Sequence, residues 1–267
     1  GTVHGIGEQD IRTRGGRFSE LRARIVGWAE GRARRSLKDC IVINPYVAEM
    51  LGGQLDRAVL HHIGNPLDVA FFENVADVER HNDFMFVAKM DRNKNLIAAI
   101  DAFALANPEL PDDARLVVYG PVADQQYHQQ CLEKIESLGL SAQVEFKGSQ
   151  PPEYIAQYMR RSRALLLTSR HEVAPMVISE ALSCGLPTIT YRKCGMQYMI
   201  QSGATGVLVE DNDVAGLADG MRFVVSAEGM EERCHQARQA YSPKQVAIET
   251  LRVYQQIIDG QTGSVSS

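Results

Sequence analysis

Two glutamates and two lysines stand where the chain changes between strand-like and helix-like segments, and the lysines favour the binding of an anion. Glu172 follows an apolar run, and Glu180 lies eight residues further on, inside a segment with helical period. Lys89 and Lys94 precede another predicted helix, where a positive charge opposes the helix dipole unless an anion is present. We therefore expect the two lysines to contact phosphate.

The segment after Glu172 adds a second anion-binding feature. A helix that starts near Pro175 places Glu180 in its second turn. The backbone amides around Ala174 to Val177 then form a helix N-terminus able to receive an anion. Isolated glutamates are most often surface residues, so the functional interpretation depends on this setting.

Elements that can position these residues alternate along the chain from residue 84 onward. Short apolar runs of β-branched and aliphatic residues, without in/out alternation, are typical of parallel strands buried on both faces. Segments of helical period separate them, which predicts a doubly wound, Rossmann-like α/β domain. Ligands bind outside the carboxyl ends of such strands, which singles out Lys89, Gly120, Gly148, residues 169–172 and residues 191–195.

The first third of the chain has a different organisation. A basic helix over 18–37, strands over 40–43 and 58–63, and a short helix over 45–51 predict part of a second α/β domain. We divide the chain into a partial N-terminal, acceptor-side domain (1–74), a linker (75–83), a donor-binding domain (84–242), and a C-terminal helix with a polar tail (243–267). Pro243 marks the start of that helix.

Composition excludes several classes of protein. With 45% hydrophobic and 23% charged residues the chain is globular, and its net charge of -5 gives no general attraction for nucleic acid. No apolar run approaches the roughly 20 residues that a membrane span requires. The five cysteines form no C-x-x-C pair, so neither zinc nor a disulfide framework is indicated, and a cytoplasmic location is expected.

Residues 169–209 resemble the donor-site motif of family 4 glycosyltransferases, which have the two-Rossmann GT-B architecture. The motif "S-R-x-E…E-A-x-x-C-G-x-P" is matched in register, and two shorter motifs match at 144–148 and 203–206. Upstream, residues 87–103 resemble the family's lysine motif, with Lys94 on the motif lysine and Lys89 where arginine is usual. The resemblance covers about residues 41–225.

This resemblance implies a retaining hexosyltransferase of polysaccharide biosynthesis, which moves a sugar from a nucleotide diphosphate sugar to a hydroxyl acceptor. By resemblance, Glu180 accepts hydrogen bonds from the ribose hydroxyls, and Glu172 contacts the transferred sugar as a catalytic residue. Lys89 and Lys94 meet the diphosphate, and Gly120 is a further donor-site position. The amides of the loop formed by Val173, Ala174, Pro175 and Met176 contact sugar hydroxyls or phosphate.

No cofactor and no metal are expected at this site. Lys89, Lys94 and a helix dipole supply the electrostatics that other transferases obtain from a divalent cation. His4 resembles the family's strand-end histidine of the acceptor domain and is a second catalytic candidate. The alternative interpretation, that His4 is a loop residue without a catalytic role, is equally well supported.

Two stretches depart from the family pattern at the donor site. The usual "E-G-F-G" reads Glu172-Val173-Ala174-Pro175, and the usual "G-G-x-x-E" reads Cys194 to Tyr198. Side chains replace glycines where backbone approaches the ligand, and Tyr198 replaces a carboxylate. These departures indicate an unusual donor sugar or reduced activity.

Several alternatives stay open at this point. One is an impaired nucleotide-sugar-binding module or one part of a split transferase; another is an epimerase or phosphorylase. The apolar stripe Phe18, Leu21, Ile25 and Trp28 is interpreted as packing on a sheet, the alternative being an interfacial helix at the inner face of a membrane near a sugar or lipid-linked acceptor. The short N-terminal part predicts a fragment that self-associates or recruits a missing-domain partner.

Overall fold

The structure, a computed structural model, describes residues 2–3, 19–73 and 79–263, with side chains over 24–73 and 79–259. The chain forms two compact units, each described by itself below. Unit 1 comprises residues 1–65 and 244–267, and unit 2 comprises residues 66–243.

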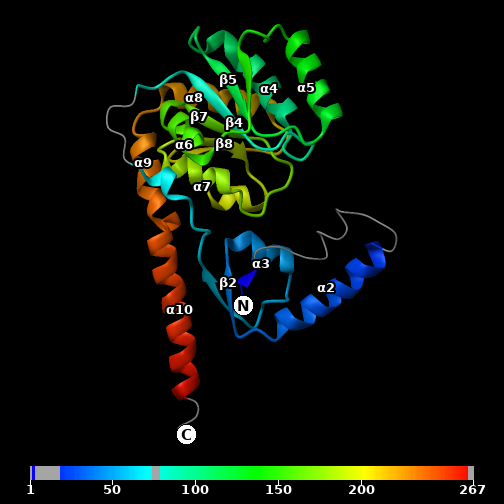
Figure 1. The fold of residues 1–267 in the computed structure, drawn as a ribbon, viewed down its shortest axis with the longest axis vertical. Coiled ribbons are helices and arrows are strands. Elements are labelled where there is room, and N and C mark those ends of the chain that lie inside the picture. The colour runs from blue at the N-terminus through cyan, green and yellow to red at the C-terminus, as the bar shows by residue number, and fades with distance from the viewer. Residues whose placement is uncertain (1, 4–18, 74–78, 264–267) are drawn as a thin grey trace. The chain divides into compact units, whose positions relative to one another are not determined.

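Unit 2 is built on a six-stranded parallel sheet with the order β6-β5-β4-β7-β8-β9 (Figure 1). The chain starts at the centre, builds outward to β6, and then returns to the other side of β4. The strands are β4 (Asp83–Val87), β5 (Arg115–Tyr119), β6 (Val144–Gly148), β7 (Ala164–Leu167), β8 (Thr188–Tyr191) and β9 (Gly206–Val209). This arrangement confirms the predicted doubly wound α/β domain.

Helices cover both faces of this sheet. One face is covered by α4 (Leu96–Ala106), α5 (Gln125–Ser137) and α8 (Val214–Ser226), and the other by α6 (Pro152–Arg161), α7 (Met176–Ser183) and the 3-10 turn η1 (Val69–Phe72). The remaining elements are η2 (Asn107–Glu109), η3 (Cys194–Tyr198), α9 (Met230–Ala237) and η4 (Arg238–Tyr241).

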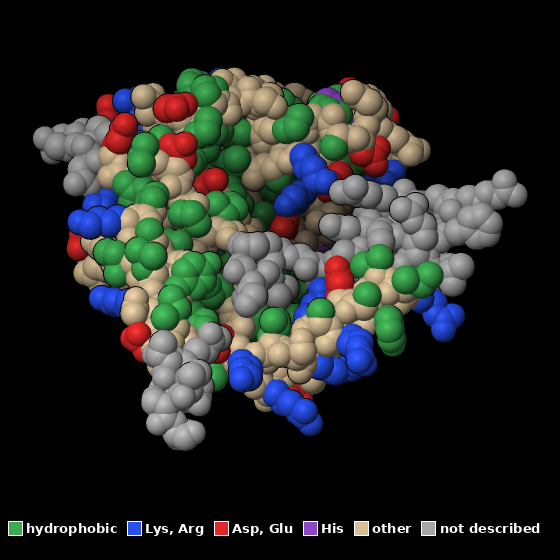
Figure 2. Space-filling view, turned by 60° about the horizontal axis from the view of Figure 1, so that its bottom comes forward, with side chains coloured by type: hydrophobic (Ala, Val, Ile, Leu, Met, Phe, Trp, Pro, Cys, Tyr) green, Lys and Arg blue, Asp and Glu red, His purple; other side chains and the backbone are tan. Residues whose placement is uncertain are grey.

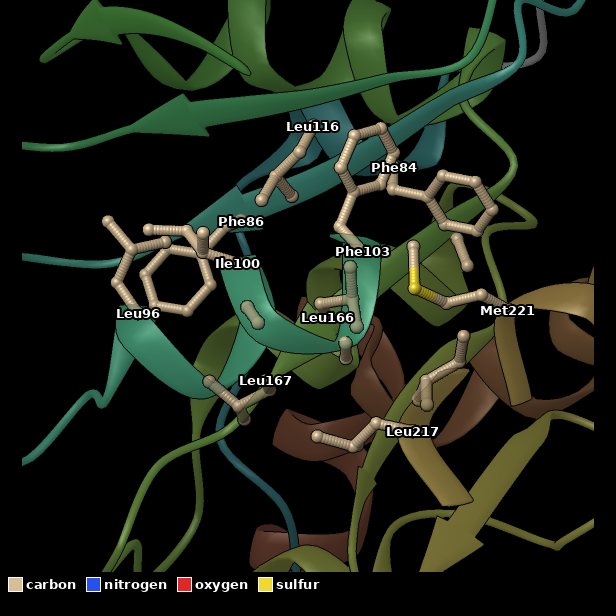
Figure 3. Close-up of a cluster of buried hydrophobic side chains, with 14 of the residues drawn as sticks. Phe84, Phe86, Leu96, Ile100, Phe103, Leu116, Leu166, Leu167, Leu217 and Met221 are labelled. Carbon is tan, nitrogen blue, oxygen red and sulfur yellow. The ribbon is translucent and has the colours of Figure 1, made fainter. Parts of the chain in front are cut away.

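Alternate residues of each strand enter the two cores. Phe84 and Phe86 of β4 pack under α4 with Leu116 of β5, whereas Met85 faces α6 and α7. Figure 3 shows Phe84 and Phe86 among side chains of α4, β7 and α8. Because side chains of a strand alternate between faces and both faces are buried here, β4 and β5 are apolar after their first residue and β7 is apolar throughout.

Unit 1 contains a three-stranded parallel sheet of order β1-β2-β3. Its elements are β1 (Thr2–Val3), α2 (Ser19–Arg35), β2 (Asp39–Val42), α3 (Pro45–Leu51), β3 (Val59–His62) and α10 (Pro243–Gly263). Ile41 and Ile63 form a small core with Val246 and Val253 of α10. The last helix of the chain therefore packs with the first strands.

Helix α2 does not bury the stripe that its sequence suggests. Ile25 is 58% exposed and Trp28 is 71% exposed, so the packing interpretation is wrong for these two side chains. The buried face carries Gly31 and Arg34 instead, and Arg34 hydrogen-bonds Gln54 at 3.3 Å. Glycine lets the helix approach its neighbour closely. Arg side chains lie beside hydrophobic ones along α2 (Figure 2, lower right).

None of the described helices is long and apolar enough to cross a membrane. This finding agrees with the composition of the chain.

The boundary between the units lies before the linker expected at 75–83. Ala70 and Phe71 of η1 are each 4% exposed within unit 2. Arg160 donates to the carbonyl of Ala70, and the Cys184 thiol lies 3.9 Å from the carbonyl oxygen of Phe71. Residues 66–73 thus belong to unit 2, because their apolar side chains are needed to cover the sheet.

Candidate functional site

Two loops at the carboxyl ends of adjacent strands lie side by side in unit 2. The loop after β4 runs to Asn95, and the loop after β7 runs to Pro175. The amide of Arg170 donates to the carbonyl of Asn93 at 2.8 Å, and the Asn93 side chain donates to the carbonyl of His171 at 3.1 Å. The strand order reverses here, which is where open α/β sheets bind ligands.

Lys94 and Glu172 meet between these loops. The ammonium group of Lys94 forms an ion pair with the Glu172 carboxylate. The side chains are only 18% and 14% exposed, respectively, so solvent screens the pair weakly. Two of the residues singled out from the sequence, 78 positions apart, are thus brought into contact.

Lys89 lies on the same loop but has a different partner. Its side chain is 59% exposed, and its ammonium group is 3.0 Å from Asp91. Burial raises the pKa of Asp91, but hydrogen bonds from Lys89 and from the amides of Lys94 and Asn93 outweigh it and leave that pKa below its ordinary value. Asp91 therefore stays ionised and orders the turn that presents Lys94.

Glu180 occupies the second turn of α7, which begins at Met176, next to the expected Pro175. Its carboxylate is partly buried, and no hydrogen bond or ion pair reaches it from the described side chains. Burial raises the pKa of Glu180 from 4.5 to about 7. A carboxylate in this state gains from any ligand that supplies hydroxyl donors.

The residues that replace the family's Gly-Phe-Gly in the loop before α7 adopt no left-handed backbone. No positive φ occurs at Val173, Ala174 or Pro175. The carbonyl of Glu172 accepts a 2.9 Å hydrogen bond from the amide of Gly195, which fixes this loop to η3. The substitutions therefore change the side chains of the loop without a left-handed backbone at these three positions.

Cys194 is different, because it keeps a left-handed backbone with φ 50 where the family motif has glycine. Such a conformation costs a non-glycine residue roughly 1–2 kcal/mol. Tyr198, four residues on, is 41% exposed. The departure from the family's G-G-x-x-E motif thus keeps the left-handed backbone at the start of η3 and changes only the side chains at Cys194 and Tyr198.

Gly120 follows β5, and close packing requires it to be glycine. Its φ is +127, and a Cβ atom placed there would lie 2.0 Å from the carbonyl oxygen of Ala88. The amide of Gly120 also donates to the carbonyl of Gly148 at 2.9 Å. Gly120 thus holds the ends of β4, β5 and β6 together; contact with a donor stays a prediction for it.

One Asp-x-Asp pattern, Asp211-Asn212-Asp213, is present in the sequence, and the structure engages both aspartates. Asp211 pairs with Lys193 at 2.7 Å, and the Asp213 carboxylate accepts the amide of Gly216 at 2.8 Å as the cap of α8. Among the described residues, no group of three or more His, Cys, Asp or Glu side chains is arranged to hold a metal ion.

His4 lies outside the described residues. Two polar residues that position the site were not singled out from the sequence. Thr168 is buried and donates to the carbonyl of Asn95 at 2.9 Å, and Asn93 joins the two loops. A polar residue directly after a buried strand is the only sequence signal that Thr168 offers.

Comparison with known proteins identifies the region that contains this site. The family model for glycosyl transferases group 1 matches residues 70–241. The chain is 27% identical over 179 residues to D-inositol 3-phosphate glycosyltransferase of Corynebacterium urealyticum, which covers 64% of this chain and 42% of that protein. It is 28% identical over 193 residues to N-acetyl-alpha-D-glucosaminyl L-malate synthase of Bacillus anthracis, covering 70% and 49%.

The chain therefore spans about half the length of these curated relatives. Among solved structures, Anabaena HepE in complex with UDP and glucose superposes with a TM-score of 0.74 at 19% identity, over 97% of this chain and 71% of that one. At this identity the likeness establishes the fold, which is that of the GT-B glycosyltransferases.

The packing at Gly120 gives a stability prediction. Gly120→Ala should lower the free energy of unfolding by more than about 3 kcal/mol, because the new methyl group overlaps the Ala88 carbonyl. Gly139→Ala is the matched control, since φ is +70 there and nothing lies within 4 Å; it should cost about 1 kcal/mol. Urea unfolding followed by circular dichroism measures both, and equal losses would refute the packing argument.

The raised pKa of Glu180 gives a pH prediction. The stabilising contribution of its protonated form is complete below about 4.5, the ordinary value, and is lost as pH rises through about 7, the folded-state value. Glu180→Gln should therefore gain stability relative to the wild type between pH 5 and pH 8, on the order of 2–3 kcal/mol. Unfolding at both pH values tests this, with exposed Glu153→Gln as control; a pH-independent difference would contradict it.

Proposed function

Since this chain belongs to the family of glycosyl transferases group 1, we propose that it binds a nucleotide diphosphate sugar and transfers the sugar to a hydroxyl acceptor with retention of configuration. The observation that carries the proposal is the pairing of Lys94 with Glu172 beside the α7 N-terminus, at the carboxyl ends of β4 and β7. The ammonium group of Lys94 and the α7 N-terminus suit the diphosphate of such a donor, and the Glu172 carboxylate suits its sugar.

The donor is assigned to this site by charge. Lys94 and the first amides of α7 bind the diphosphate, since both offer positive potential to an anion. Lys89 adds a more distant positive charge from the loop surface. Glu180 accepts hydrogen bonds from the vicinal ribose hydroxyls, which satisfy a carboxylate that otherwise has no partner in the described structure.

Glu172 acts on the transferred sugar. Its position between Lys94 and η3 lets it accept hydrogen bonds from sugar hydroxyls close to the leaving diphosphate. Positive charge preorganised at the leaving group stabilises the charge that develops when the glycosidic bond breaks. We infer that this electrostatic assistance, without a metal ion or another cofactor, supports the reaction.

The acceptor is a hydroxyl group of a sugar or a lipid-linked glycan, and the reaction takes place in the cytoplasm. All five cysteines are free, as expected for a protein of a reducing compartment. The acceptor and further partners of the whole protein are also part of this proposal, because the matched region covers less than half of each of these curated relatives.

Lys94→Ala should weaken the binding of nucleoside diphosphates tenfold to a hundredfold, because a charge-assisted contact is worth about 1.5–3 kcal/mol. Calorimetric titration with UDP, GDP and ADP measures the change. Lys134→Ala is a charge-matched control, since Lys134 pairs with Asp101 on the α4–α5 side of the sheet. Unchanged affinity in Lys94→Ala would exclude the phosphate role.

Removal of divalent cations by a chelator should leave both donor binding and sugar transfer intact. The physical reason is that Lys94 and the α7 N-terminus already neutralise the diphosphate. Transfer of radiolabelled sugar, assayed with and without EDTA, tests this. Loss of activity that manganese restores would overturn the metal-independent mechanism, and nucleotide binding without any transfer would favour a binding module.

A further inference from the structure

The Lys94–Glu172 ion pair joins two groups that a bound donor needs separately. On the proposed function, which this inference takes as its basis, Lys94 serves the diphosphate and Glu172 serves the sugar. In this structure each neutralises the other within a mostly buried contact. A diphosphate that enters the site must therefore compete with Glu172 for Lys94.

The backbones on both sides of this pair are fixed. Thr168 and Asn93 fasten the two loops to each other, and Gly195 holds the carbonyl of Glu172 from the other side. Asp91, the acidic residue on the lysine loop, is engaged with Lys89 and with the amide of Lys94. Exchange of partners at Lys94 is thus a matter of side-chain rotation on a rigid frame.

We propose that Glu172 is an internal counter-ion that makes the site select an intact nucleotide diphosphate sugar over the free nucleoside diphosphate. The selectivity arises because only the intact donor offers a replacement partner to Glu172 when Lys94 turns to the phosphates.

The energetic argument compares the two ligands. Sugar hydroxyls donate hydrogen bonds to the Glu172 carboxylate, so its charge stays satisfied after Lys94 leaves. A free nucleoside diphosphate has no such donors and leaves Glu172 as a mostly buried carboxylate without a partner, next to another anion. Its net gain from Lys94 is therefore smaller.

This arrangement also favours turnover. When the sugar has been transferred, the product diphosphate remains beside a carboxylate that has lost its hydroxyl donors. Glu172 then competes again for Lys94, and each re-formed ion pair weakens the hold on the product. The Lys94–Glu172 ion pair thus weakens the binding of the free nucleoside diphosphate both before the reaction and after it, when this diphosphate is the product.

The test is a comparison of affinities in wild type and Glu172→Gln. Calorimetric titration uses UDP, GDP and ADP and their glucose conjugates. Glutamine cannot neutralise Lys94, so Glu172→Gln should bind the free diphosphate on the order of tenfold more tightly than the wild type. It should bind the sugar conjugate no more tightly, so the preference for the intact donor falls by the same factor.

A double-mutant cycle separates the ion pair from general charge repulsion. In a Lys94→Met background, Glu172→Gln should change diphosphate affinity by less than about threefold, because the shared partner is gone. Exposed Glu228→Gln is the charge-matched control, and Glu172→Ala replaces Glu172→Gln if circular dichroism shows the latter to be unfolded.

Equal diphosphate affinity in wild type and Glu172→Gln, or an equal gain in the Lys94→Met background, would overturn the counter-ion role and leave the proposed function standing. Absence of binding of every nucleotide to both wild type and Glu172→Gln would overturn the proposed function and the counter-ion role together.

Discussion

Burial of the six-stranded sheet on both faces is the constraint on which the rest of unit 2 depends. A parallel sheet needs helical crossovers, and these cover its two sides with α4, α5 and α8 on one and α6, α7 and η1 on the other. Strands β4, β5 and β7 carry charged residues only at their starts, and the polar residues of the site lie outside them. They gather at the carboxyl ends, where β4 and β7 bring two loops distant in sequence next to each other.

The site depends on how charge is balanced at that edge. Lys94 and Glu172 balance each other, and Asp91 is balanced by Lys89 and backbone amides, whereas Glu180 has only its burial and a raised pKa. A partly buried carboxylate without a partner is costly in the free protein. Hydroxyl donors of a ligand would relieve that cost. Glu180 is therefore the carboxylate of the site that gains most from hydrogen bonds to a ligand.

The local sequence pattern was sufficient to locate most helices and strands, but it did not predict which face of a helix is buried. The apolar runs located five of the six strands of unit 2, because burial on both faces leaves a clear signal, whereas β9 was not singled out. The stripe on α2 misled, since Ile25 and Trp28 are exposed while Gly31 and Arg34 are buried. Hydrophobicity alone cannot reveal a helix that packs through a glycine and an arginine stem. The boundary of the units was also placed late, because the few apolar residues of η1 resemble a loop.

By itself, the sequence determined the fold class, the position of Lys94, Glu172 and Glu180 at strand ends or in a helix start, and the family, because those depend on residue type and spacing along the chain. Only the tertiary structure decided which of these residues touch. Lys94 meets Glu172 across 78 positions, Lys89 turns to Asp91, and Asp211 and Asp213 serve an ion pair and a helix cap. Partners of charged side chains are set by distance and burial in space, and one-dimensional spacing carries neither.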